Sequence, residues 1–556
     1  MRYLLLLIFS IVTYGYSADT DRVDDWEYNS SIEHLDNNMP LGGSIAPRVF
    51  SKNLGFAVGG AKDTNNFIEN IESGYLPRVS SITYEGQFYR HHFDIGEGGD
   101  SCRELFCPRY STAKRLNIFS KEEEYFLSVG LSSNINEVNF RRKKLNLVIA
   151  LDISGSMGAN FNRYYYDTSR RRALDGERKS KIEIATESIV AMLSHLNGDD
   201  RFGVVLFDDR AYRAKPLREL KFTNRDAIKA HILALKERGG TDWSAGYREA
   251  IELFNKIEPN GEYENRIIFL TDAMPNSGEL RRDRLFGLAR SASDRDIHTT
   301  FIGVGVDFNS DLVEYISKVR GANYFTVNSS QEFKKLLDRE FNYMVTPLVY
   351  DLKLELESRD YEIDAIYGSP EVDLASGDIM RVNTLFPSPT DERGAEGGVV
   401  LLKLKRVADG NGTVTLRVGY MDLNGSRYEN VQSIKFKGDR EYYDNLSIRE
   451  AIAVSDFVTI IKNWLIDSRA SCNDRVKGFI DTVVAVIERS SKFPPKRDIY
   501  RSVEGWERKS CKLVVSDGYR ELFKLFRDHL MREMKILNGD PLKIELKILD
   551  RLIKEQ

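Results

Sequence analysis

Between residues 145 and 345, short apolar runs alternate with segments whose apolar residues recur every three or four positions. The apolar runs occupy residues 145–151, 202–207, 266–271, 298–305 and 323–328. Continuous apolar runs of this length are typical of strands buried on both faces of a sheet. The segments with helical periodicity occupy residues 181–196, 226–236, 244–257, 282–294 and 311–320, and a closing helix is expected over 331–345. This alternation predicts an α/β fold with a doubly wound, mainly parallel sheet that helices cover on both faces.

Residues 211–220 are also expected to form a strand, but at an edge of this sheet. Pro216 lies within the segment and has no N–H to donate to a neighbouring strand. An edge strand is paired on one side only, so it can tolerate the proline.

The flanking segments have different periodicities. After residue 346, apolar and polar residues alternate over several short runs, which predicts a β-rich module over residues 346–440. Residues 441–556 return to a helical pattern, whose apolar faces are expected to pack on other elements, with a surface for a partner helix as the alternative. Residues 66–144 are mixed and are treated as an N-terminal flanking region. Residues 19–65 are polar and rich in turn formers, so they are predicted to be a flexible lead-in.

The first 18 residues predict export. Arg2 precedes an apolar stretch that ends near Val12, and small residues follow at Ser17 and Ala18. This is the pattern of a secretory signal peptide. A membrane anchor is the alternative, but the stretch is shorter than the roughly 20 residues that span a bilayer. We therefore expect a protein that is periplasmic, displayed on the cell surface or secreted, with no transmembrane segment in the mature chain.

The cysteines and the net charge indicate the redox state of the thiols and the kind of partner. The four cysteines are Cys102, Cys107, Cys472 and Cys511. In an oxidising compartment they are predicted to pair as 102–107 and 472–511, with free buried thiols as the alternative. The formal net charge of −4 argues against nucleic acid as the main partner.

Oxygen-bearing side chains gather where the predicted strands end. Asp152 closes the first strand, and Ser154 and Ser156 follow it in the sequence DISGSMG. Thr241 follows the glycines of RGGTDW, and Asp272 ends a later strand in FLTDAM. Ligands of open α/β sheets bind at this edge, and carboxylates with hydroxyls suit a hard divalent cation, Mg²⁺ first, with Mn²⁺ or Ca²⁺ as alternatives. Neutral hydroxyls leave the cation able to accept a further carboxylate from a protein partner.

The sequence DISGSMG, together with Thr241 and Asp272, resembles the metal-ion-dependent adhesion site (MIDAS) of von Willebrand factor type A (VWA) domains. In that family the corresponding residues coordinate Mg²⁺ directly or through water. The resemblance implies that Asp152, Ser154, Ser156 and Thr241 hold the cation and that Asp272 supports it. One departure is Ala273, where the family has glycine.

The wider chain resembles exported bacterial VWA proteins that carry von Willebrand-like regions on both sides of the metal domain. The segments NNFIENIESGYLP (65–77), FLSVGLSSN (126–134) and YEIDAIYGSPE (361–371) carry this looser resemblance. It leads to the hypothesis that the flanks form one β module into which the VWA domain is inserted. The hypothesis requires contact between residues 125–140 and 346–440.

A rim beside the metal loop is the expected partner-binding surface. Residues 159–178 include Tyr164, Tyr165, Tyr166, Arg170, Arg171 and Arg172, and Asp242 follows Thr241. Tyrosine and arginine are enriched in binding hot spots. The alternative is a solvated loop, with Asp242 capping the following helix.

Two enzyme classes and a structural role compete with this interpretation. Ser156, Asp272 and His298 occur in the order of α/β-hydrolases, but residue 154 is Ser where the nucleophile elbow needs Gly. His298 also opens its strand, at the opposite edge of the sheet from Ser156. No phosphate-binding glycine loop with lysine supports Mg²⁺-dependent phosphoryl transfer. We therefore predict a non-enzymatic adhesion-type binding protein, with a metal-stabilised structural envelope protein as the alternative.

Overall fold

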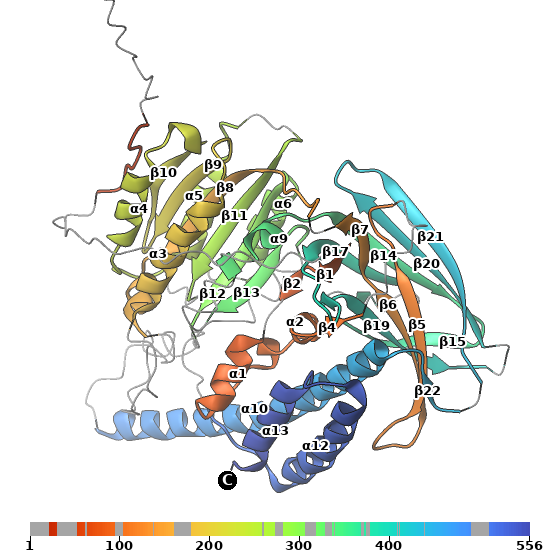
Figure 1. The fold of residues 1–556 in the computed structure, drawn as a ribbon. Coiled ribbons are helices and arrows are strands. Elements are labelled where there is room, and N and C mark those ends of the chain that lie inside the picture. Colours follow the sequence, from red (N-terminus) through yellow and green to blue (C-terminus); the bar gives the residue numbers. More distant parts are fainter. Residues whose placement is uncertain are drawn as a thin grey trace, which may run out of the picture.

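The computed structural model of the chain has three parts (Figure 1). A central α/β domain lies at the left, a β module at the right, and C-terminal helices below them. The described residues are 22–29, 53–61, 64–94, 104–136, 138–160, 179–257, 261–272, 282–305, 319–327, 336–337, 340–368, 372–373, 379–408, 410, 412–438, 440–490 and 511–555. The predicted signal peptide and residues 311–318 of one predicted helix lie outside them.

The central domain is built on a seven-stranded sheet with the order β10-β9-β8-β11-β12-β13-β2. Its strands are β8 (Lys144–Asp152), β9 (Arg201–Phe207), β10 (Ala211–Glu219), β11 (Tyr263–Thr271), β12 (Ile297–Val304), β13 (Asn323–Val327) and β2 (Gly60–Ala61). Neighbouring strands are parallel except β10, which runs antiparallel to β9 at the edge. The predicted doubly wound sheet and the edge position of residues 211–220 are both confirmed.

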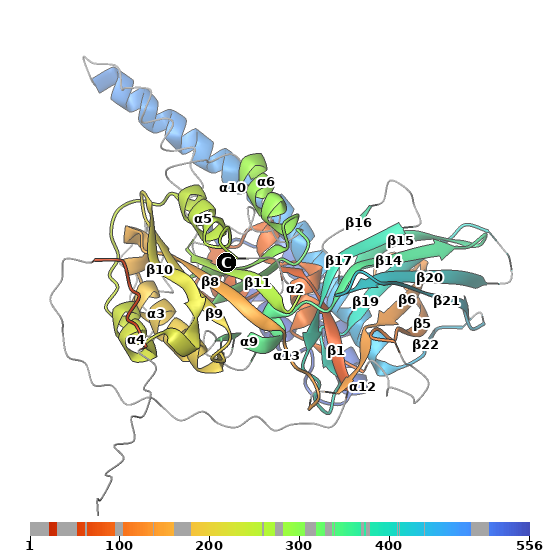
Figure 2. The same ribbon diagram turned by 90° about the horizontal axis from the view of Figure 1, so that it is seen from above.

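Helices cover both faces of this sheet, as Figure 2 shows from above. Successive residues of a strand point to opposite faces, so β8 contributes to two apolar clusters. Leu147 and Ile149 pack with α3 (Lys181–Met192), α4 (Arg225–Leu233) and α9 (Phe341–Val345). Val148 and Ala150 pack with α5 (Trp243–Glu252) and α6 (Arg282–Ser293). Burial on both faces explains why the strand sequences are apolar throughout.

The β module consists of two sheets around one core. One has the order β21-β20-β14-β17-β1-β7, with β16 paired to β17, and the other has the order β15-β19-β6-β5-β22. The strands are β1 (Asn53–Val58), β5 (Arg109–Leu116), β6 (Glu123–Gly130), β7 (Ser132–Asn136), β14 (Val349–Glu357), β15 (Tyr361–Tyr367), β16 (Val372–Asp373), β17 (Ile379–Ser388), β19 (Val399–Arg406), β20 (Thr413–Asp422), β21 (Arg427–Lys435) and β22 (Tyr442–Tyr443). Phe56, Leu127, Leu352 and Leu402 are among the buried residues that join the two sheets.

Strands from before and after the central domain share these sheets. β6 pairs with β19, with Leu127 opposite Leu402, and β1 pairs with β17. The required contact between residues 125–140 and 346–440 is therefore present. The chain enters and leaves the central domain side by side: Arg142 Nε donates to Asn342 Oδ1 over 3.0 Å, and the rings of Phe140 and Tyr343 stack.

The prediction of a flexible lead-in over residues 19–65 is wrong for two segments. β1 is a paired strand between β17 and β7, and its Leu54 and Phe56 are fully buried. Residues 22–29 lie on the central domain, where Val23 forms a bridge with Thr223. Tertiary pairing orders both segments although their sequences are short and rich in polar or small residues.

The C-terminal helices pack with two helices from the N-terminal flank. α10 (Leu446–Ser490), α12 (Asp517–Leu537) and α13 (Lys543–Ile553) share an apolar cluster with α1 (Asn65–Glu72) and α2 (Tyr84–Tyr89). The two-stranded pairs β3 (Tyr75–Leu76) with β23 (Cys511–Lys512) and β4 (His92–Phe93) with β18 (Ala395–Glu396) add further links. Among the described residues, no helix combines the length and apolar character needed to cross a bilayer.

Two of the four cysteines have described side chains. Cys107 and Cys511 are buried, and each is in a disulfide bond. Cys102 and the side chain of Cys472 lie outside the described part of the chain. The pairing 102–107 and 472–511 therefore stays a prediction.

Candidate metal centre

The predicted metal residues lie where the strand order of the central sheet reverses. The chain passes from β8 outward to β9 and β10, then crosses to β11 on the other side of β8. In open α/β sheets the crevice at this switch point, beyond the carboxyl ends of the strands, is where ligands bind. Asp152 ends β8, and Asp272 follows directly after β11.

Four of the five predicted ligands form one buried hydrogen-bonded cluster. The backbone N–H of Ser154 donates to Asp152 Oδ1 over 2.8 Å. The Ser154 and Ser156 hydroxyl oxygens are 3.1 Å apart, and Ser156 Oγ donates to Asp272 Oδ1 over 2.8 Å. Asp152, Ser154 and Asp272 are almost fully buried and Ser156 is nearly so. The structure therefore brings together oxygen atoms from two strand ends that are 120 residues apart.

The loop that carries Thr241 is fastened to the serine loop by backbone hydrogen bonds. The N–H of Gly155 donates to Gly239 O over 3.1 Å, and the N–H of Arg238 donates to Ile153 O over 2.6 Å. Gly239 has a φ of +69°, and a Cβ there would lie 2.9 Å from Asp209 Oδ2. This turn requires glycine, and it delivers the buried Thr241 to the same edge of the sheet.

Asp242 caps α5, as expected for an acid at this position. Its Oδ1 accepts hydrogen bonds from the Ala245 N–H over 3.0 Å and from Ser244 Oγ over 2.8 Å. The carboxylate is half-buried, and a role for it at a partner-binding rim stays a prediction. The other rim residues, Tyr164–Tyr166 and Arg170–Arg172, lie outside the described residues, as does Ala273.

Lys181 is a charged member of the cluster that the sequence did not reveal. Its Nζ lies 3.0 Å from Asp272 Oδ2, and both side chains are fully buried. Lys181 occupies the first position of α3, where the helix dipole disfavours a cation. A lysine at this unfavourable position is expected to have an anion nearby, and this was the signal in the sequence that could have identified Lys181. A second unpredicted contact comes from Thr271, whose hydroxyl donates to Asp152 Oδ2 over 2.6 Å.

The charges of the cluster favour a bound cation. Burial, and then repulsion from Asp272, raise the pKa of Asp152 to about 7. One buried lysine cannot neutralise two buried carboxylates, and an uncompensated buried charge is unfavourable. A divalent cation would remove that excess, and carboxylate and hydroxyl oxygens are the ligands that Mg²⁺, Mn²⁺ and Ca²⁺ prefer. The residues present thus fit the predicted metal.

The arrangement does not support a hydrolase triad. His298 is paired in register with Arg266, and Arg266 with Leu147, five residues before Asp152 on β8. That separation corresponds to about 16 Å along a strand. His298 Nδ1 instead lies 2.7 Å from Glu264 Oε1, at the opposite edge of the sheet from Ser156. A general base must be within hydrogen-bond reach of its nucleophile, and His298 is not.

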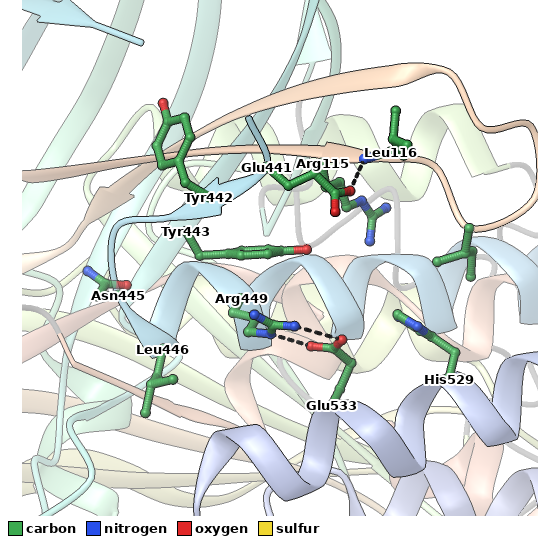
Figure 3. Close-up of a pocket in the computed structure, with 11 residues that line it drawn as sticks. Arg115, Leu116, Glu441, Tyr442, Tyr443, Asn445, Leu446, Arg449, His529 and Glu533 are labelled. Atoms are coloured by element: carbon green, nitrogen blue, oxygen red, sulfur yellow. Dashed lines mark hydrogen bonds and ion pairs between the residues drawn. The ribbon is translucent and has the colours of Figure 1, made fainter. Parts of the chain in front are cut away.

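A separate pocket of about 660 Å³ lies between the β module and the C-terminal helices (Figure 3). Arg449 and Glu533 lie side by side in its lining, and Arg449 donates to both carboxylate oxygens of Glu533, over 2.6 and 3.1 Å. Arg115 also lines the pocket and is paired with Glu124 and Asp456. The described lining residues include no serine or cysteine nucleophile, and these arginines are satisfied within the protein.

Comparisons with known proteins identify a VWA domain within the central domain. Residues 147–275 match the family model of the von Willebrand factor type A domain. An uncharacterized protein from Synechocystis sp. is 28% identical over 210 residues, which are 37% of this chain and 44% of that protein. The inter-alpha-trypsin inhibitor heavy chain H1 of Sus scrofa is 23% identical over 248 residues, which are 44% of this chain and 24% of that protein. The similarity therefore spans less than half the length of these relatives.

Two VWA proteins are among the solved structures that align with part of the chain. A von Willebrand factor type A protein from Catenulispora acidiphila aligns with 67% of this chain and 84% of its own, at 14% identity and a TM-score of 0.43. Proximal thread matrix protein 1 from the mussel byssus, with a zinc-occupied MIDAS motif, aligns with 37% of this chain and 49% of its own, at 18% identity and a TM-score of 0.29.

Proposed function

We propose that residues 147–275, which form a VWA domain, bind a protein partner through a divalent cation held at the carboxyl ends of β8 and β11. The observation that carries the proposal is the buried cluster of Asp152, Ser154, Ser156 and Asp272 at the switch point of the sheet. VWA domains mediate protein–protein interactions, which supports a binding role.

Each residue has a distinct part in the proposed site. Asp152, Ser154, Ser156 and Thr241 would hold the cation, and Asp272 would support it through water or through Ser156. Mg²⁺ is the first choice because the donors are all oxygens, and Mn²⁺ or Ca²⁺ could replace it. The bound cation would supply a positive centre that attracts an anionic oxygen.

The charges within the cluster favour an acidic partner. The two carboxylates contribute −2 and Lys181 contributes +1, so a divalent cation leaves the site with a net charge of +1. A single carboxylate from another protein would restore neutrality. Lys181 therefore strengthens the case for an aspartate or glutamate at the centre of the partner's binding surface.

The chain is further proposed to act outside the cytoplasm as a non-enzymatic protein. The amino-terminal sequence supports export to the periplasm, the cell surface or the medium. A metal-stabilised structural envelope protein is the alternative, since the cation would also relieve repulsion inside the domain.

Calorimetric titration with Mg²⁺ and Mn²⁺ tests the site. The chain from residue 19 should bind one cation saturably, and Asp152→Ala should abolish binding. Asp226→Ala is a matched control, because Asp226 is an exposed carboxylate on α4 outside the cluster. If folded wild-type protein binds neither metal, even with excess acidic peptide, the proposed site is wrong.

A second measurement separates the binding protein from the structural alternative. An acidic peptide immobilised on a sensor should retain the protein in Mg²⁺ and release it in EDTA. If the cation raises the melting temperature but peptide retention is the same in EDTA, the metal has a structural role only.

A further inference from the structure

Residues 22–29 lie as an extended peptide across the edge of the central domain that is formed by β10, the turn before α4 and His231 of α4. Three backbone hydrogen bonds fix the peptide. Val23 donates to Phe222 O over 3.0 Å and accepts from the Asn224 N–H over 2.9 Å, and Glu27 donates to Ala214 O over 2.7 Å. One of these bonds is to β10 and two are to the turn before α4, so backbone groups hold the peptide at this edge of the domain.

A buried lysine selects an aspartate in this peptide. Lys215 Nζ lies 3.0 Å from Asp25 Oδ2, and the lysine side chain is fully buried. The same ammonium group donates to Phe202 O over 2.8 Å, which fixes its position. Without a carboxylate, this edge would hold a poorly solvated cation, which is unfavourable.

Aromatic side chains on the same edge select the residues that follow. Trp26 stacks on His231, with ring centroids 5.3 Å apart and planes 7° from parallel. Asp24 accepts a hydrogen bond from His231 Nε2 over 2.9 Å. Tyr28 contacts the edge of the Tyr212 ring, and the Arg238 guanidinium lies over both tyrosines. This edge therefore has specific contacts for a carboxylate, a tryptophan and a tyrosine at successive positions of the peptide.

We infer that this edge is a peptide-binding site for an extended acidic–aromatic segment of the form Asp-Asp-Trp-x-Tyr, which residues 22–29 fill within the same chain. The occupant is the same segment of a second copy of this chain, which takes the place of the chain's own segment. Residues 30–52 join the segment to β1, and 23 residues can extend to about 75 Å, enough to reach a neighbouring molecule. The site shares Arg238 with the loop that leads to Thr241 but includes none of the five predicted cation ligands, and the inference does not depend on the proposed metal function.

A labelled peptide tests this inference on the full chain. The probe is a fluorescein-labelled peptide with the sequence of residues 22–29, RVDDWEYN. The protein carries Asp25→Ala and Trp26→Ala, which weaken its own segment and leave the rest of the chain intact. Fluorescence polarisation should show saturable binding to this variant. Wild-type protein should bind the probe at least tenfold more weakly, because its own tethered segment occupies the site.

Matched controls decide the outcome. A probe with the tryptophan replaced by alanine should lose at least tenfold in affinity, and this control requires no change to the protein. Adding Lys215→Met or His231→Ala to the variant should have a similar effect, and His231 is half-exposed, so its replacement should not disturb folding. The inference is overturned if the wild-type probe does not bind the folded variant, or if both probes bind it equally.

Discussion

A buried histidine between two glutamates makes the docking of the C-terminal helices sensitive to pH. His91 follows α2, and its Nδ1 lies 2.8 Å from Glu450 Oε1 on α10. Its Nε2 lies 3.3 Å from Glu545 Oε1 on α13. Gln87 donates to the same oxygen of Glu545. One side chain thus joins three segments that are far apart in the sequence.

The magnitude follows from the environment of the imidazole. Burial alone would lower the pKa of His91, but the carboxylates of Glu545 and Glu450 outweigh it and raise the pKa from 6.5 to about 9. A difference of this size corresponds to about 3 kcal/mol of folding free energy. Because the folded pKa is the higher one, this stabilisation is complete below about pH 6.5. It is lost as the pH rises through 9.

Urea denaturation followed by circular dichroism between pH 6 and 9.5 measures this effect. His91→Gln should lower the unfolding free energy by about 3 kcal/mol at pH 6, and the difference from wild type should shrink towards pH 9.5. His195→Gln, in the central domain, is a matched control that should leave this pH dependence unchanged. A wild-type minus His91→Gln difference that is constant across the range would show that His91 is not charged in the folded protein, and would refute the reasoning.

Three further predictions concern the central domain and its proposed cation site. Lys181→Met should tighten Mn²⁺ binding at least tenfold in calorimetry, because the lysine competes with the cation for Asp272; unchanged or weaker binding would contradict this. Mn²⁺ affinity should fall as the pH drops below about 7, because burial and Asp272 raise the pKa of Asp152 and protons then compete with the cation. An affinity that stays constant down to pH 5.5 would show that the carboxylate of Asp152 is already ionised and would contradict this. Gly239→Ala should cost about 1–2 kcal/mol in thermal unfolding, because its φ is positive and Asp209 fills the space of a Cβ; a melting temperature equal to that of wild type would refute this.

The sequence predicts the central domain well because its inner strands, β9, β8, β11, β12 and β13, are buried along almost their whole length. Such strands have apolar runs that need no tertiary information, and Pro216 identified the edge strand directly. The positions of Asp152, Ser154, Ser156 and Asp272 were also predictable, since side chains at the carboxyl ends of adjacent parallel strands must meet.

What escaped prediction depends on partners distant in the sequence. The position of Lys181 at the start of a helix indicates that it needs an anion, but only the folded structure identifies Asp272 as that anion. Residues 22–29 are mostly polar and lack periodicity. Their defined conformation is explained only by contacts with distant residues such as Lys215 and His231. β17 lies within the predicted β-rich module, but its place between β14 and β1 could not be predicted, because these partners come from both sides of the central domain.

The adjacent entry and exit of the central domain determine how it would transmit mechanical force. The crossings lie beside the amino end of β8, where Arg142 meets Asn342. The proposed cation site lies at the carboxyl end of the same nine-residue strand, about 30 Å away. Tension from a partner held at the cation would therefore run along β8 towards the β module. β8 is paired on both sides, with β9 and β11. Such a pull would therefore act on many hydrogen bonds at once, parallel to the strand, and would not break them one after another. Single-molecule pulling between the metal edge and the β module should accordingly require a higher unfolding force than pulling across the strands, from β10 to β13.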